Sequence, residues 1–305
     1  MARVTDDAEL DLNLLPALGA LLEDRNLTRA GERIGMSQPA MSAALARLRR
    51  HYGDDLLERE GRGYRRTVFG EQLLPAVREA LRHLDTTMQR SPTFDPADSD
   101  RDFSIAASDY TVSILADPLL RLVNRIAPRI TLHLNALPAG LSSSGAALAM
   151  HDLLIGPVGF DFPGRHTELF RDRLVCVVAP VASGLSGPAL SLEDLARLPH
   201  AEPAFAPGQP TPVDRVLDQL GITRRVRVTT FGWLSVPFAL VGTEMVAIVP
   251  ERMARLAVRS APLAILEPPF GRVELVEAAY WQPSRTDDPA VRWLLVTLKE
   301  AARAL

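Results

Sequence analysis

Two short helical segments lie close together in this chain and are joined by Gly35, Met36 and Ser37. Thr28 fits the N-cap of the first segment, and Gly35 suits its end because glycine readily adopts the left-handed conformation there. Ser37 fits the N-cap of the second segment, with Pro39 in its first turn. Two short helices joined by so tight a turn predict a helix-turn-helix. The second helix has one apolar stripe, which consists of Met41, Ala44, Leu45 and Leu48.

The segments on either side of this pair extend the same prediction. A further helix is expected over residues 12–25, and two short strands around the turn at Gly61–Gly63 form a hairpin, or wing. Thr67 fits the cap of a long helix from Val68 to about Gln89, whose apolar positions recur at three- and four-residue spacing. Because a rod with one apolar face needs a partner, we predict self-association. The predicted dimerisation residues are Leu73, Leu74, Val77, Leu81 and Leu84.

The charge of the chain is unevenly distributed. The formal net charge of the 305 residues is −3, which by itself does not favour a nucleic-acid ligand. From Arg25 to Arg66, however, ten arginines face five acidic residues, a local net charge of +5 that leaves −8 for the rest. A small basic unit on a larger acidic body is typical of proteins that bind DNA through one domain.

The start of the second helix is the predicted DNA-reading element. Recognition helices read the major groove with their N-terminal residues, and glutamine can form two hydrogen bonds to adenine. The alternatives are an ordinary helical hairpin and, for the arginines of the wing, a solvated turn. The predicted DNA-binding residues are Thr28, Ser37, Gln38, Pro39, Ser42, Ala43, Arg47, Arg62 and Arg65.

Beyond about residue 101, strand and helix patterns alternate. Such alternation predicts a mostly parallel α/β sheet, in which ligands bind at the carboxyl ends of the strands. The expected strands are 103–107, 130–135, 152–155, 169–179, 225–230, 245–249 and 273–281, and the expected helices are 110–126, 211–220, 233–241 and 289–304.

The stretch from Leu12 to about Met88 resembles the DNA-binding region and linker helix of LysR-type transcriptional regulators. Gly31 departs from this resemblance, since alanine is usual there and glycine costs a helix up to about 1 kcal/mol. The matching segments are Leu27–Ala30, Ser37–Ser42, Leu45–Arg49 and Gly61–Gly63 in the head, and Pro118–Arg121, Ala127–Pro128 and Asp152–Gly156 beyond it. Val249–Arg252 resembles a segment of the branch that includes nodulation and aromatic-compound regulators.

The resemblance implies a fold class and a domain plan. The expected fold is an N-terminal winged helix-turn-helix, mainly α, with a long linker helix, followed by a two-lobed α/β effector domain like the periplasmic binding proteins. Homodimers through the linker helix, and commonly homotetramers, are also implied. The expected boundaries are 1–66 for the DNA-binding domain, 67–90 for the linker helix, 91–100 for a hinge and 101–305 for the effector domain, with lobe I at 101–163 and 267–305 and lobe II at 164–266.

A small-molecule effector is expected between the two lobes. Ser108 and Asp109 follow the first strand and precede a helix, where their side chains can hold a ligand or merely cap the helix. Asp109 disfavours a carboxylate placed against it. Aromatic candidates favour an apolar or aromatic ligand, although each can equally be a core residue. The predicted effector-binding residues are Ser108, Asp109, Leu137, Pro138, Gly156, Phe205, Pro207, Phe231, Trp233 and Thr243.

Other classes of function find less support. The sequence has no connected set of acid, base and nucleophile, and its six histidines lack metal-ligand spacing, so we expect no enzyme, metal or cofactor. Cys176 lies in an apolar strand and is expected to be inert. No membrane span or secretory signal is evident, which favours a cytoplasmic protein. The main hypothesis is an effector-responsive regulator that binds double-stranded DNA, and RNA polymerase if it activates. A solute-binding protein whose head serves only for assembly is the second.

Overall fold

The computed structural model describes residues 11–61, 63–88, 93–137, 148, 150–159, 162–185, 187–204 and 212–305. The chain divides into two compact units, residues 1–90 and 91–305. Within the described ranges, no helix is both long enough and apolar enough to cross a membrane.

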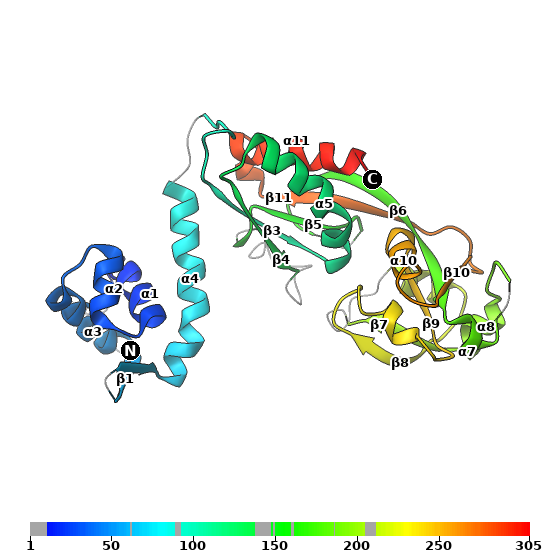
Figure 1. The fold of residues 1–305 in the computed structure, drawn as a ribbon, viewed down its shortest axis with the longest axis horizontal. Helices are drawn as coiled ribbons and strands as arrows, with labels where there is room; N and C mark the ends of the chain where they lie inside the picture. The colour runs from blue at the N-terminus through cyan, green and yellow to red at the C-terminus, as the bar shows by residue number, and fades with distance from the viewer. Residues whose placement is uncertain are drawn as a thin grey trace, which may run out of the picture. The chain divides into compact units, whose positions relative to one another are not determined.

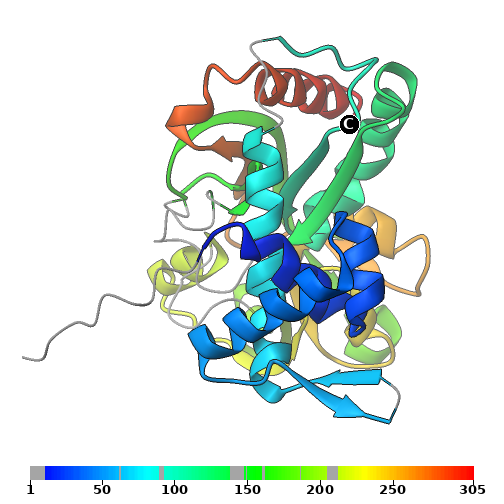
Figure 2. The same cartoon turned by 90° about the vertical axis from the view of Figure 1, so that its left-hand side faces the viewer.

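The first unit consists of helices and a two-stranded hairpin (Figure 1). Its elements are α1 (Leu14–Asp24), α2 (Leu27–Ile34), α3 (Gln38–Tyr52), β1 (Leu57–Glu60), β2 (Gly63–Arg66) and α4 (Val68–Met88). The strands pair antiparallel, with Glu58 opposite Arg65, and the hairpin extends away from the helices (Figure 2). The predicted apolar stripe of α3 is buried in a core that also contains Leu18, Leu21 and Leu22 of α1. The winged helix-turn-helix is therefore confirmed.

Two of the three predicted helix caps are confirmed and one is wrong. The Ser37 hydroxyl accepts the Ala40 N–H at 3.4 Å, and the Thr67 hydroxyl accepts the Gly70 N–H at 3.0 Å. Thr28 is not the cap of α2. That cap is Asn26, whose side-chain oxygen accepts the N–H groups of Thr28 and Arg29 at 3.0 and 3.1 Å. Thr28 is instead an exposed residue in the first turn.

The long helix α4 packs against its own unit as far as Leu81. Leu74 and Val77 are 6% and 3% exposed and belong to the same core as α1. A Cβ atom on Gly19 of α1 would lie 2.5 Å from Leu81 Cδ1, so α1 and α4 approach closely there. The prediction that Leu74 and Val77 face a second copy is therefore wrong, because α1 already covers them. Leu84 is 40% exposed and stays a candidate for that role.

The second unit has two lobes joined by long strands (Figure 1). Lobe I contains β3 (Asp102–Ala107), α5 (Asp109–Ile126), β4 (Thr131–Ala136), β5 (Leu153–Pro157), η3 (Pro283–Arg285) and α11 (Pro289–Arg303). Lobe II contains α7 (Pro180–Ser183), α8 (Leu192–Arg197), β7 (Pro199–Pro203), α9 (Pro212–Gln219), β8 (Arg225–Thr230), η2 (Pro237–Leu240), β9 (Val246–Pro250), α10 (Glu251–Ala257) and β10 (Ala264–Leu266). The strands β6 (Arg165–Val178) and β11 (Glu274–Trp281) connect the two lobes.

The sheet of this unit is mixed rather than mostly parallel. Its strand order is β4-β3-β5-β11-β6-β9-β7-β8, with β10 on β6. Within each lobe the neighbours are parallel, as β3 is to β4 and β5, and as β7 is to β8 and β9. The expectation failed at β6 and β11, which run antiparallel to each other and to the strands beside them. Alternation along the sequence does not reveal that these two strands cross between lobes.

The helix expected over residues 233–241 is also wrong. The backbone turns at Gly232, which has a φ of +71°, and the segment contains the 3-10 helix η2 rather than an α-helix. Pro237 explains the difference, because proline has no N–H for the helical hydrogen bond that would continue the segment.

Candidate nucleic-acid interface and interlobe site

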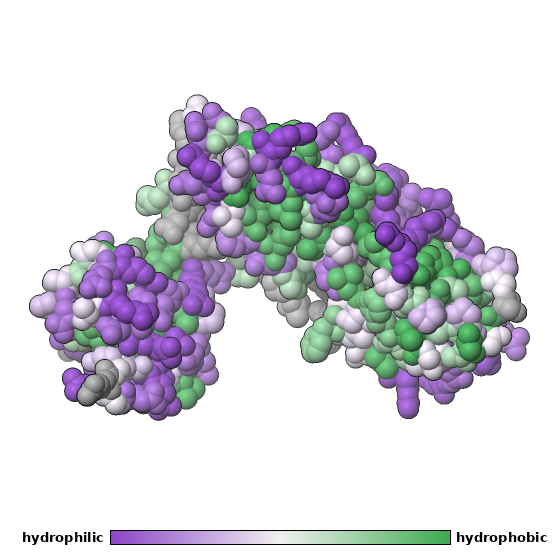
Figure 3. Space-filling view, viewed as in Figure 1, coloured by the Kyte–Doolittle hydropathy of each residue, from purple (hydrophilic) through white to green (hydrophobic). Residues whose placement is uncertain are grey.

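One face of α3 is buried and the opposite face is open to solvent. The exposed positions follow from helical spacing, since Met41, Leu45 and Leu48 point into the core. Hydrophilic residues cover the surface over α2 and α3 in the view of Figure 3. The exposed residues of α3 and its cap include Ser37, Gln38, Pro39, Ser42, Ala43, Arg47 and Arg50. All five predicted DNA-binding residues from Ser37 to Ala43 therefore lie on one open surface, together with Arg47.

The polar side chains on this surface are available to a ligand. Gln38, Ser42 and Arg50 have no hydrogen-bond or ion-pair partner among the described residues. Arg47 is 3.2 Å from the carboxylate of Asp11. An ion pair this exposed contributes little stability, so a phosphate group can replace Asp11 at small cost. Thr28, at the start of α2, is exposed as well.

Several arginines of the basic segment have structural partners. Arg49 donates to the carbonyl oxygens of Asp55 and Leu57 at 2.8 and 2.5 Å, and Arg66 donates to the Leu22 carbonyl at 2.7 Å. These two side chains tie the hairpin to the helices. Arg65, on the wing, is 2.8 Å from Glu58 across the hairpin. Arg62 lies outside the described residues.

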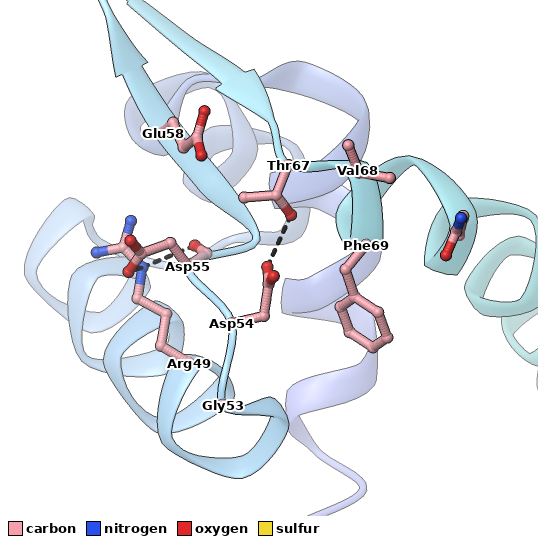
Figure 4. A pocket seen from close by; sticks show the side chains of 9 residues that line it. Arg49, Gly53, Asp54, Asp55, Glu58, Thr67, Val68 and Phe69 are labelled. Atoms are coloured by element: carbon pink, nitrogen blue, oxygen red, sulfur yellow. Dashed lines mark hydrogen bonds and ion pairs between the residues drawn. The ribbon is translucent and has the colours of Figure 1, made fainter.

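A recess of about 700 Å³ lies beside this surface, where α3 ends and β1 and α4 begin (Figure 4). Asp54 fixes its wall: one carboxylate oxygen accepts both the Thr67 hydroxyl and the Leu56 N–H at 2.7 Å. Asp55 and Glu58 also line the recess. Its lining has these three carboxylates and one arginine, Arg49, which does not favour DNA phosphates, so we assign this recess a structural role.

At the start of α5, a row of hydroxyl groups leads to a buried carboxyl. Ser108 is the N-cap, and its oxygen accepts the Thr111 N–H at 3.1 Å and lies 2.8 Å from Thr111 Oγ1. The Thr111 hydroxyl donates to Glu277 of β11 at 3.1 Å. When Glu277 is ionised, the single hydroxyl hydrogen of Thr111 is used in the hydrogen bond to Glu277. The Ser108 hydroxyl must then donate to the Thr111 oxygen. The Ser108 oxygen then remains an acceptor toward solvent or a ligand.

A second buried carboxyl lies nearby on β6. The Tyr110 hydroxyl donates to Asp172 at 2.6 Å, and the Arg252 N–H donates to the same oxygen at 3.2 Å. Burial, reinforced by the charge of Asp172, raises the pKa of Tyr110 above its usual range. Burial also raises the pKa of Glu277, to about 7, and the charge of Asp172 adds to this effect while the hydrogen bond from Thr111 opposes it. Both lobe-connecting strands thus carry a buried acid at the start of α5.

Asp109 lies at the same place and connects the lobes directly. Its two carboxylate oxygens accept the backbone N–H groups of Trp233 and Leu234, each at 2.9 Å. Asp109 belongs to α5 of lobe I, whereas the two donors belong to the turn after β8 in lobe II. The structure therefore brings together Ser108, Asp109 and Trp233, three of the predicted effector-binding residues.

Of the other predicted effector-binding residues, Leu137, Gly156 and Thr243 have their contacts elsewhere in the unit. Leu137 packs on a small cluster that contains Ala106 and Tyr280, and the backbone of Gly156 lies against Phe162. Thr243 donates to the Leu240 carbonyl within its own turn. Phe231 is 98% exposed, and Pro138, Phe205 and Pro207 lie outside the described residues.

Four residues of this site were not predicted from the sequence: Thr111, Asp172, Glu277 and Leu234. Thr111 and Glu277 are 166 positions apart, and no local pattern marks two residues on distant elements as neighbours. A buried acid inside an apolar strand was the one available signal, since charged residues are seldom fully buried without a partner. Among the described residues, no group of three or more histidine, cysteine, aspartate or glutamate side chains is placed to hold a metal ion.

A winged helix-turn-helix with an open polar helix face, followed by a two-lobed α/β unit, defines a DNA-binding transcriptional regulator. The chain belongs to the LysR family. Residues 12–71 match the model for the bacterial regulatory helix-turn-helix proteins of the lysR family, and residues 97–303 match the LysR substrate-binding domain. It is a regulator with an effector-binding domain and not an enzyme.

Relatives match along almost the whole chain. Nodulation protein D 3 of Rhizobium leguminosarum bv. phaseoli is 38% identical over 301 residues, which cover 96% of this chain and 98% of that protein. Nodulation protein D 1 of Sinorhizobium fredii is 36% identical over 300 residues, with coverage of 96% and 92%. The resemblance noted at Val249–Arg252 is thus confirmed at the level of the whole sequence.

Solved structures agree on the fold. A probable transcriptional regulator of Pseudomonas aeruginosa superposes with a TM-score of 0.72 at 32% identity, covering 95% of this chain and 96% of that one. The LysR family regulator CbnR superposes with a TM-score of 0.64 at 19% identity, with coverage of 96% and 99%.

Proposed function

We propose that the exposed face of α3 reads base edges in the major groove of DNA. The observation that carries this proposal is that Gln38 and Ser42 are exposed, lie one helical turn apart and have no partner among the described residues. Amide and hydroxyl groups so placed suit hydrogen bonding to base edges. Arg47 and Arg50 are placed for phosphate contacts, and Arg62 and Arg65 of the wing for phosphates or the minor groove. Thr28, Ser37, Pro39 and Ala43 complete the proposed interface.

The effector is proposed to bind between the two lobes and to be apolar or aromatic. Phe231 supports this, because an aromatic side chain that is 98% exposed gains from being covered by an apolar ligand. It stands two residues before Trp233, in the turn that Asp109 binds. Ser108 supplies a hydroxyl at the facing end of α5. The lobes are proposed to span 101–163 with 267–305, and 164–266.

The regulator is proposed to act in the cytoplasm as a dimer or tetramer, and to contact RNA polymerase if it activates. Leu84 and Met88 support self-association. They lie one turn apart on α4, which places them on one side of the helix, and are 40% and 80% exposed. Residues 67–90 serve as the linker helix in this proposal, between a DNA-binding domain at 1–66 and a hinge at 91–100.

Footprinting on the DNA upstream of the protein's own gene tests the DNA-binding proposal. We expect protected bases at moderate salt, in two patches related by a partial palindrome. Binding should weaken steeply as salt rises, because arginines that contact phosphates release counterions. Protection of no particular sequence at moderate salt contradicts the proposal.

A thermal-shift screen tests the effector proposal. Aromatic metabolites are added to the full-length protein, and a specific ligand is expected to raise its unfolding temperature by mass action. Phe231→Ala should reduce the shift at a given ligand concentration. Val181→Ala is the matched control, because Val181 is 99% exposed elsewhere in lobe II. Equal shifts in both variants would contradict a role for Phe231.

A further inference from the structure

The turn after β8 presents two backbone N–H groups in the same direction. Those of Trp233 and Leu234 both point at the carboxylate of Asp109, and each bond measures 2.9 Å. Adjacent backbone N–H groups arranged in this way form a binding site for anions. Here the anion belongs to the chain itself, on the other lobe.

The turn is shaped to admit this carboxylate. Gly232 has a φ of +71°, a conformation that favours glycine. A Cβ atom on Gly232 would lie 2.4 Å from Asp109 Oδ2, so no other side chain fits while Asp109 is in place. Asp109 Oδ1 also accepts the Tyr110 N–H at 2.9 Å, which fixes the side chain against its own helix.

We propose that Asp109 is an internal ligand of lobe II, which ties the 231–234 turn to the start of α5 and excludes anionic effectors from that turn. The part about effectors rests on the proposed interlobe site, whereas the tie between the lobes does not. Asp109 occupies the anion-binding N–H groups, and its charge repels a carboxylate placed nearby. Ser108 also presents an acceptor when Glu277 is ionised. The start of α5 is therefore suited to effector groups that donate hydrogen bonds.

Chemical rescue by acetate tests the tie between the lobes. Asp109→Ala removes the carboxylate and leaves space for an external one. Spin labels at Leu120→Cys on α5 and Val181→Cys on α7 report the distance between the lobes in the full-length protein, diluted with unlabelled chain. Cys176 is buried and burial raises its pKa to about 12, so it does not take up label at neutral pH.

We expect one narrow distance distribution for the wild type and a broader, longer one for Asp109→Ala. Acetate should restore the narrow distribution in that variant and leave the wild type unchanged. Asp117→Ala is the matched control, because Asp117 is an exposed carboxylate on the same helix. If the distance distribution of Asp109→Ala without acetate equals those of the wild type and of Asp117→Ala, the tie does not exist.

Asp109→Asn is the second variant, for the case that Asp109→Ala does not fold. It loses one of the two acceptors and is expected to broaden the distance distribution without rescue by acetate. An unchanged distribution in that variant would likewise overturn the tie.

Benzoate binding tests the exclusion of anions. Calorimetry on the full-length wild type should show no saturable binding of benzoate, whereas Asp109→Ala should bind it. Saturable binding to the wild type, or none to the variant, overturns this part of the proposal. The spin-label result does not depend on the thermal-shift screen, whereas the benzoate result shares with that screen the proposed interlobe site. If no neutral aromatic ligand stabilises the protein while acetate rescues Asp109→Ala, the effector proposal fails and the tie stands.

Discussion

The carboxyl group of Glu277 shows how burial changes the behaviour of a single residue. It is 2% exposed, and burial raises its pKa from an ordinary 4.5 to about 7. The folded protein therefore holds this proton more tightly than the unfolded chain does. The stability contributed by the group is fully present below about pH 4.5 and is lost as the pH rises through 7.

Glu277→Gln should remove this pH dependence. Glutamine keeps an acceptor for the Thr111 hydroxyl but has no charge to bury. Relative to the wild type, the variant should lose less stability between pH 5 and pH 8, by up to about 3 kcal/mol. Urea unfolding of the full-length protein at several pH values measures the difference. Glu193→Gln, at an exposed carboxyl on α8, is the control. If the curves for wild type and Glu277→Gln run parallel, the folded protein does not hold Glu277 protonated near neutral pH.

At Gly31, helix propensity and tertiary packing favour different residues. Helix propensity favours alanine at this position by up to about 1 kcal/mol. In the structure, a Cβ atom on Gly31 would lie 2.4 Å from the Met36 carbonyl oxygen, so an alanine requires the turn before α3 to move. Glycine in place of the usual alanine thus lets the backbone at Met36 lie close against α2. The sequence alone does not reveal this contact.

Among the elements, α2 has its N-cap at Asn26, whereas the sequence pattern placed both the cap and a DNA contact at Thr28. Asn26→Ala removes the acceptor for two backbone N–H groups and should cost about 1 kcal/mol of the stability of the first unit. Thr28→Ala should cost less than half as much and instead weaken DNA binding. Chemical unfolding and DNA titration of the two variants measure both effects. Greater destabilisation by Thr28→Ala would contradict the assignment.

Helical periodicity predicted the elements of the first unit well, because one face of each helix is buried within a short stretch of chain. Met41, Leu45 and Leu48 determine which side of α3 faces outward without any knowledge of the rest of the fold. The sequence predicted the interlobe site only in part. Asp109 was chosen for its place after a strand and Trp233 as an aromatic residue, but their bond depends on two lobes meeting across 124 positions. The antiparallel course of β6 and β11 is likewise set by contacts between distant segments.

For the whole molecule, self-association should depend on the last turns of α4, beyond Leu81. Leu84→Glu combined with Met88→Glu places charges on an exposed apolar side and should weaken the dimer at least about tenfold, or ~1.4 kcal/mol. Sedimentation velocity measures the change. Val77→Glu is the contrasting variant, because Val77 is buried against α1 and its replacement should unfold the first unit. An unaltered dimer in the double variant would place the interface elsewhere.

Sequence-specific binding by this regulator depends on whether the outward face of α3 reads DNA bases. Affinities of the wild type, Gln38→Ala and Arg50→Ala for a set of operators, each with one base pair changed, test it most directly at fixed salt. We predict that Gln38→Ala loses about 1–3 kcal/mol of discrimination at one base pair of each half-site, and that Arg50→Ala weakens binding to all operators alike. If Gln38→Ala instead lowers affinity equally for every operator, this face of α3 does not read sequence through Gln38.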